Sequence, residues 1–164
     1  MSFTHLDAAG HAHMVDVTSK QPTVRTATAR GFVRCSAEVI AALRDGTAPK
    51  GDVIAVARIA GIQAAKATPS LLPLAHVIGV HRASVELDIV DDGVHVEATV
   101  GTADRTGVEM EALTAVSVTA LAIVDMIKGI DRAVVIEDVR IVAKSGGRSG
   151  DWVRQGEIAP EDAR

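Results

Sequence analysis

The sequence predicts an α+β protein, a ferredoxin-like sandwich in which helices pack on one face of an antiparallel four-stranded sheet. Alternating apolar residues indicate the strands, and a period near 3.6 residues indicates the helices. Their order along the chain is strand, two helices, two strands, long helix, strand, which is the split βαβ arrangement when the first two helices form one crossover. At 164 residues we expect one domain, with an N-terminal arm (1–22), a core (23–144) and a Gly-rich, charged tail (145–164).

Composition excludes several classes of function. Aromatic residues make up only 2% of the chain, which disfavours recognition of single-stranded nucleic acid by stacking, and the net charge of −4 is not that of a DNA-binding protein. The one cysteine, Cys35, allows no internal disulfide, cysteine-rich zinc site or iron–sulfur cluster. Without a signal peptide or an apolar run of membrane-spanning length, we expect a cytoplasmic protein with no nucleic-acid or membrane partner.

The first segment, residues 1–22, has no clean period and contains His5, His11 and His13. A His-x-His pair can bind a metal, but no third ligand follows at a suitable spacing. We therefore expect a polar, extended arm with incidental histidines and no metal site.

Alternation from Thr23 to Ser36 predicts the first strand. The residues on one of its sides are Val24, Thr26, Thr28, Arg30 and Phe32. Ser36 is expected to cap a short helix that stops at the turn pair Asp45-Gly46.

A second helix is expected from an N-cap at Asp52 towards Thr68, ended by Pro69 and Pro73. Its many small residues let another backbone approach closely, within a subunit or between subunits. They are Ala55, Ala57, Ala60, Gly61, Ala64 and Ala65.

Two strands follow, over residues 77–90 and 94–103, joined by the hairpin turn Asp91-Asp92-Gly93. Both alternate between apolar and polar residues, so one face of the hairpin is buried and one is polar. His76 lies just before the first of these strands, and from its position alone it is a structural histidine.

The stretch from Arg105 to Asp131 is the longest helical pattern, with Thr106 as N-cap and Glu109 as its capping-box partner. This helix is apolar nearly all round, which favours burial by a partner subunit. Its broad apolar face contains Leu113, Val116, Ala120, Ile123, Val124 and Ile127. Asp125 and Lys128 are three residues apart and can touch. They are either an acid/base site or an ordinary surface pair, and the spacing alone favours the surface pair.

The last strand is expected over residues 133–144, and the tail after it is expected to be mobile or ordered only on binding. The tail begins with SGGRSG, whose backbone amides beside Lys144 and Arg148 suit a phosphate. The full P-loop pattern is absent, so the sequence does not predict an NTPase.

Six motifs in order resemble one family, the molybdenum cofactor biosynthesis protein C family, cyclic pyranopterin monophosphate synthase. The resemblance covers the chain from about His5 to Asp151. The motifs are HMVDV, KGDV followed by ARIAGIQAAK, Pro-Leu-x-His at residues 73–76, TGVEMEALTAVSV, DMIK and AKSGGRSG.

This resemblance implies a lyase of molybdopterin biosynthesis that acts after a radical S-adenosylmethionine enzyme has cyclised GTP. The family converts 3′,8-cyclo-7,8-dihydro-GTP, a triphosphate, into cyclic pyranopterin monophosphate and releases pyrophosphate. It forms homohexamers, trimers of dimers, with the active site between subunits. No cofactor is implied, the sequence offers no dedicated metal site, and magnesium could still accompany the triphosphate.

The resemblance also assigns roles to residues. Asp125 and Lys128 match the catalytic aspartate and lysine, which reverses the preference that spacing gave. The other matching pocket residues are Lys50, His76, Glu109, Glu111, Lys144 and Arg25. Lys50, Lys144 and Arg25 would bind the triphosphate. His76 would be catalytic, and Glu109 and Glu111 would serve the base or assist proton transfer. These two glutamates are two apart and point to different sides of a regular helix, so they belong to different sites or one is only a cap.

The chain departs from the family at one place, where Ala75-His76-Val77 replaces the usual Cys-His-Pro. Loss of a catalytic thiol would be fatal, whereas loss of a packing thiol at Ala75 would cost little. Because Lys128, Asp125 and His76 are retained, we expect an active enzyme with an altered rate. The alternative is a reduced-activity or non-catalytic paralogue that binds a purine nucleotide or assembles with other proteins.

Overall fold

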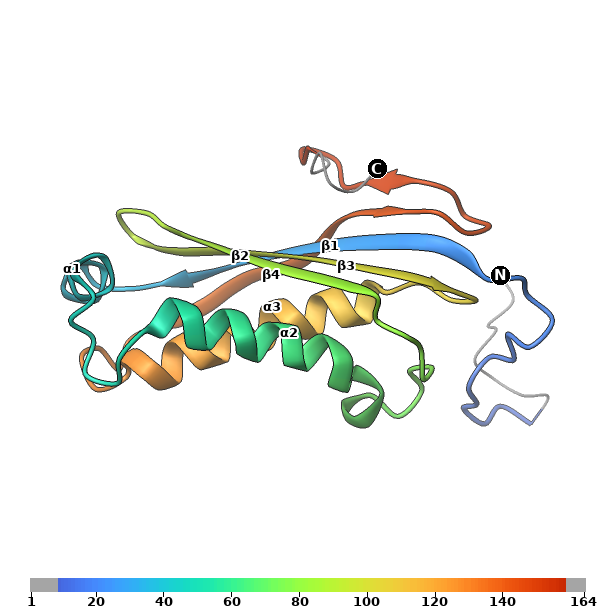
Figure 1. The fold of residues 1–164 in the computed structure, drawn as a ribbon, viewed down its shortest axis with the longest axis horizontal. Helices are drawn as coiled ribbons and strands as arrows, with labels where there is room; N and C mark the ends of the chain where they lie inside the picture. The colour runs from blue at the N-terminus through green and yellow to red at the C-terminus, as the bar shows by residue number, and fades with distance from the viewer. Residues whose placement is uncertain (1–8, 159–164) are drawn as a thin grey trace.

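One antiparallel sheet carries the fold in the computed structural model, which describes residues 9–158 (Figure 1). Its strands are β1 (Thr23–Arg34), β2 (Arg82–Ile89), β3 (Gly93–Asp104), β4 (Val135–Ser145) and β5 (Trp152–Val153). Their order across the sheet is β2-β3-β1-β4-β5. The first four strands and the helices between them form the predicted ferredoxin-like sandwich, and β5 is an additional short strand.

The helices are α1 (Ala37–Asp45), α2 (Val53–Leu71) and α3 (Glu109–Ile127). The two predicted N-caps are confirmed: the Ser36 hydroxyl accepts from Val39 N, and the Asp52 carboxylate accepts from Ala55 N at 2.9 Å. The predicted end of α2 is wrong, because Pro69 lies inside its last turn. A proline so close to the end removes one backbone hydrogen bond without preventing the final residues from remaining helical.

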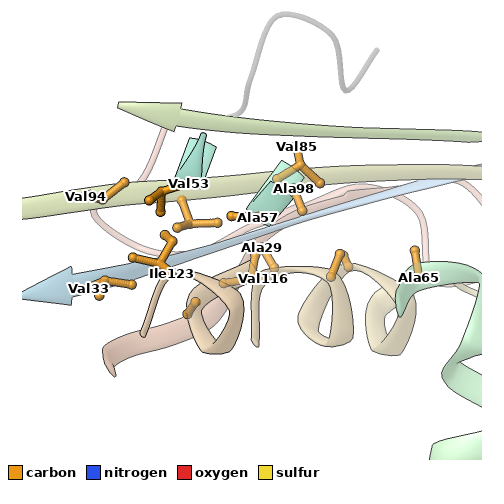
Figure 2. Close-up of a cluster of buried hydrophobic side chains, with 14 of the residues drawn as sticks. Ala29, Val33, Val53, Ala57, Ala65, Val85, Val94, Ala98, Val116 and Ile123 are labelled. Atoms are coloured by element: carbon orange, nitrogen blue, oxygen red, sulfur yellow. The ribbon is translucent and has the colours of Figure 1, made fainter. Parts of the chain in front are cut away.

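Helices α2 and α3 cover one face of the sheet and enclose the core, while α1 lies at one end of it (Figure 1). Figure 2 shows core side chains from both layers, among them Val33, Val116 and Ile123. A Cβ on Gly61 would lie only 2.1 Å from Thr119 Oγ1 and 3.1 Å from the Ala115 carbonyl oxygen. The small residues of α2 therefore let the two helices approach closely within the subunit.

Helix α3 begins later than predicted, at Glu109. The N-cap position is Val108 and has no side-chain cap, so the expected capping box of Thr106 with Glu109 does not form. The reason is tertiary: the Glu109 carboxylate accepts a hydrogen bond from Lys144 Nζ on β4 at 3.0 Å instead.

The expected apolar face of α3 is buried at Val116, Ala120, Ile123 and Ile127 and only partly buried at Leu113 and Val124. Among the described residues, α3 is the one helix with the length and hydropathy of a membrane span. Half of it is buried against α2 and the sheet, as in the core helix of a globular protein.

The tail is ordered over its described part, contrary to the expectation of mobility. β5 pairs with β4, with Lys144 opposite Trp152. Beyond it, the Glu157 carboxylate forms ion pairs with Arg30, at 2.6 Å, and with Arg140 on the helix-free face of the sheet. The two arginines account for the ordered tail, because the guanidinium group of each forms an ion pair with the carboxylate of Glu157.

The predicted hairpin is confirmed, although β2 starts at Arg82 rather than at residue 77. The preceding segment runs beside β3 without forming a regular ladder, since Thr102 Oγ1 donates to the Gly79 carbonyl oxygen and His81 N donates to that of Gly101. One of the arm's histidines, His5, lies outside the described residues.

Candidate active site at the two ends of the long helix

The first group of predicted site residues lies at the C-terminal end of α3. Asp125 lies in its last turn, Lys128 follows the helix, and Lys50 comes from the loop before α2. Lys128 Nζ donates to Asp125 Oδ1 at 2.7 Å, and Lys50 Nζ donates to Oδ2 at 2.9 Å. Lys50 Nζ also donates to the Asp125 carbonyl oxygen at 2.7 Å. The carboxylate is thus held between two ammonium groups; we call these three residues the C-terminal cluster.

The two lysines determine the charge state of this cluster. Hydrogen bonds from Lys128 and then Lys50, with the attraction of their charges, lower the pKa of Asp125 to about 2. A carboxyl group with that pKa is ionised at neutral pH. Asp125 can therefore orient the ammonium groups, and the protons available for transfer are those of the lysines.

The second group lies at the N-terminal end of α3. Glu109 pairs with Lys144, and Glu111 is only 3% exposed. Burial raises the pKa of Glu111, the nearby charge of Glu109 raises that pKa further, and His76 opposes the rise. The two glutamates therefore share one neighbourhood with His76, although they leave the helix in different directions. We call Glu109, Glu111, His76 and Lys144 the N-terminal cluster.

His76 also forms a hydrogen bond with the N-terminal arm. Its Nε2 lies 2.7 Å from the carbonyl oxygen of Val15, which can only accept, so this nitrogen carries the proton. Further along the arm, Arg105 Nε donates to the Lys20 carbonyl oxygen at 2.9 Å. The arm was expected to be extended, but no sequence pattern indicated either contact.

Ala75, in the place of the family's cysteine, lines an apolar hollow beside the N-terminal cluster. The other residues of this hollow are Ala12, Leu72, Pro73, Leu74 and Met110. Val77, in the place of the family's proline, is 90% exposed. A thiol at position 75 would thus contact apolar side chains.

Arg25 lies at the same end of the molecule, at the start of β1. Its Nε donates to the Asp104 carbonyl oxygen at 3.1 Å, and its Nη2 donates to that of Arg105 at 3.3 Å. The guanidinium group is held in place by carbonyl oxygens and keeps its full charge available for an anion.

The two clusters do not meet within one chain. Asp125 follows Glu109 by sixteen residues of uninterrupted helix, which at 1.5 Å per residue separates them by about 24 Å. Figure 1 shows the two ends of α3 at opposite ends of the molecule. Within residues 9–158, no three His, Cys, Asp or Glu side chains gather in a way that could hold a metal ion.

Comparison with known proteins gives one consistent result. Residues 14–147 match the profile of the MoaC family. The cyclic pyranopterin monophosphate synthase of Nocardioides sp. is 55% identical over 154 residues, covering 92% of this chain and 94% of the relative. The synthase of Streptomyces coelicolor is 56% identical over 151 residues (92% and 89%), and that of Chloroflexus aurantiacus is 55% identical over 153 residues (92% and 94%).

Proposed function

This chain belongs to the MoaC family, and on that premise we propose how its residues carry out the family's reaction. Its activity is that of a cyclic pyranopterin monophosphate synthase, a lyase of molybdenum cofactor biosynthesis. The substrate is 3′,8-cyclo-7,8-dihydro-GTP, and the products are cyclic pyranopterin monophosphate and pyrophosphate. Since the substrate is derived from a nucleotide, we propose that the enzyme works in the cytoplasm.

The C-terminal cluster is the observation that carries the proposal. Rearrangement of a purine-derived ring into a pterin needs several proton transfers, and Lys128 is the group that donates and recovers protons. Asp125, with its pKa near 2, stays ionised and fixes the direction of the ammonium group. Lys50, on the other carboxylate oxygen, contributes a second positive charge to the substrate phosphates.

Formation of the cyclic monophosphate is a phosphoryl transfer within the substrate. A hydroxyl oxygen attacks the α-phosphorus, the bond from that phosphorus to the bridging oxygen breaks, and pyrophosphate leaves with the electron pair. The hydroxyl proton passes to a base of the site. Lys144 and Arg25 stabilise the charge that accumulates on the leaving group.

The separation of the two clusters supports a site shared between subunits. Two copies related by a two-fold axis and packed with their α3 helices antiparallel would place the C-terminal cluster of each beside the N-terminal cluster of the other. Apolar side chains on the outer surface of α2 and α3 suit such an interface: Ile59 is 67% exposed and Leu121 is 58% exposed. Three such dimers would form the expected homohexamer.

The direct test is to incubate the purified chain with the cyclised GTP intermediate and to measure cyclic pyranopterin monophosphate by mass spectrometry. An Ala75→Cys variant is run beside it. We expect product from both at similar rates, because the thiol would only fill the apolar hollow beside Met110.

Product from the variant alone would mean that the chain has lost a catalytic thiol. Absence of product from both, with the hexamer intact, would refute the assignment and favour the non-catalytic paralogue.

A further inference from the structure

The described part of the C-terminal tail turns back and lies along β4, on the side of the sheet away from α2 and α3 (Figure 1). β5 pairs with β4 so that Trp152 is opposite Lys144. Arg154 extends this contact, because its backbone N donates to the Val142 carbonyl oxygen at 2.8 Å. The tail therefore forms an added edge of the sheet directly beside a lysine of the N-terminal cluster.

Two arginines lie opposite each other on the neighbouring strands that the tail covers. Arg30 on β1 and Arg140 on β4 are direct cross-strand partners. Like charges in this position destabilise a sheet unless a negative charge is placed between them. Glu97 on β3 accepts from Arg30 Nε at 2.6 Å, but within residues 9–158 no carboxylate of the four long strands pairs with Arg140.

Glu157 of the tail supplies the missing negative charge. Its carboxylate accepts from Arg30 Nη1 at 2.6 Å and from Arg140 Nε at 2.9 Å, so one group bridges both arginines. Its side chain is only 13% exposed, against 33% for Glu137, which pairs with Arg34 farther along the same two strands. Hydrogen bonds from Arg140 and then Arg30 lower the pKa of Glu157 although burial opposes them, so the bridge is charged at neutral pH.

The bridge closes the tail onto the sheet just beyond β5. β5 is only two residues long, and a strand pair of this length is not stable by itself. Lys144, the residue that β5 covers, donates from Nζ to the Glu109 carboxylate at 3.0 Å, with its side chain 30% exposed. A lysine side chain has many rotamers, and ordered neighbours are needed to restrict it to one of them.

We propose that Glu157 is a positioning residue of the active site. By bridging the two arginines it keeps β5 on β4, and β5 in turn keeps the Lys144 ammonium group in place. The inference rests on the proposed function for the role of Lys144. It gives the tail a task that neither the sequence pattern nor the resemblance assigned to it.

The test compares the full-length wild type with Glu157→Gln, which removes the charge and retains the size of the side chain. Trp152 is the one tryptophan of a chain without tyrosine, so intrinsic fluorescence reports on β5 alone. Acrylamide quenching of this fluorescence is expected to increase about twofold, because Trp152 is 42% exposed and release of the tail would expose the rest. Glu137→Gln is the matched control: it takes one carboxylate from an arginine on the same strands, outside the tail, and should leave quenching unchanged.

The reactivity of Lys144 is measured without turnover, by labelling with acetic anhydride and peptide mass spectrometry. In Glu157→Gln, Lys144 should react several-fold faster as its contact with Glu109 loosens, while Lys128 at the other end of α3 keeps its wild-type rate. For the cyclised GTP intermediate, kcat/KM is expected to fall about tenfold, because a charged group that contacts the substrate is displaced. Glu157→Asp, which retains the charge, should recover part of each loss.

Wild-type quenching in Glu157→Gln would overturn the proposal, because the ion pairs would then not hold the tail. Increased quenching with wild-type labelling of Lys144 would overturn it as well, since the tail would then not position the lysine. A thermal melt of each variant establishes that the fold is intact. A chain that shows both changes but makes no product would refute the proposed function and leave the positioning of Lys144 by the tail standing.

Discussion

The two ends of α3 carry the same kinds of side chain in opposite environments. At the C-terminal end, a carboxylate lies between two lysines in solvent, with Asp125 56% exposed, and its pKa falls to about 2. At the N-terminal end, Glu111 is buried and its pKa is raised. The carboxyl group at the first end is therefore ionised at neutral pH, while the carboxyl group at the other end holds its proton more tightly. Acid/base chemistry that needs both environments requires a second copy of the chain.

The largest effect is expected from Lys128→Ala. Removal of the ammonium group takes away the proposed proton carrier, and turnover should fall about a thousandfold, the usual weight of general acid/base catalysis. Within the described residues Lys128 Nζ pairs with Asp125 of its own chain, so the assembly should not change. Product formation is measured by mass spectrometry and the oligomeric state by size-exclusion chromatography. Full activity in this variant would eliminate Lys128 as the catalytic lysine.

A mixing experiment tests whether the two ends work together across subunits. Lys128→Ala and Glu111→Gln, each expected to be inactive alone, are co-expressed so that their subunits pair at random. In a mixed dimer, one site receives both defects and the other receives none, so the mixture should recover about a quarter of wild-type turnover.

The control for mixing pairs two variants of the same end, Lys128→Ala with Asp125→Asn. Every site then contains one defect, and no recovery is expected. Recovery in the control, or none in the test mixture, would mean that each chain builds its site from its own residues.

A smaller, opposite pair of effects is expected in the pH dependence of stability. The pKa of Asp125 is lowered from 3.8, so its contribution to stability is present above about pH 4 and is lost as the pH falls towards 2. The pKa of Glu111 is raised from 4.5, so its contribution is favourable at low pH and is lost as the pH rises from 4.5 towards its folded-state pKa.

Urea denaturation of Asp125→Asn and Glu111→Gln across pH 2–8 measures the difference. Relative to the wild type, the first variant should lose stability as the pH rises from 2 to 4, and the second should gain stability as the pH rises above 4.5. Parallel pH profiles for the two variants would show that the two ends do not differ electrostatically.

The features predictable from sequence were local ones. The caps at Ser36 and Asp52, the hairpin turn and the contact between Asp125 and Lys128 each involve residues only a few positions apart. The alternation of apolar residues in the strands and their period near 3.6 residues in the helices were enough to predict the order of these elements along the chain. The ferredoxin-like fold follows from that order.

Features that depend on distant residues were predicted wrongly or not at all. The predicted capping box does not form because the Glu109 carboxylate accepts a hydrogen bond from Lys144, thirty-five residues later. The ordered tail depends on contacts of Glu157 with Arg30 and Arg140. Lys50 entered the prediction through family resemblance alone, since nothing in its spacing relates it to Asp125, seventy-five residues away. Tertiary ion pairs of this kind leave no periodic signal.

The continuity of α3 has a consequence for how the active sites of an assembly behave. The helix is an unbroken rod, and in a dimer of the proposed kind its two ends belong to two different catalytic centres. If α3 moved along its axis when substrate bound at one centre, it would also displace the residues that this subunit contributes to the neighbouring centre. The positions of catalytic residues in the two centres would then be linked through this one helix.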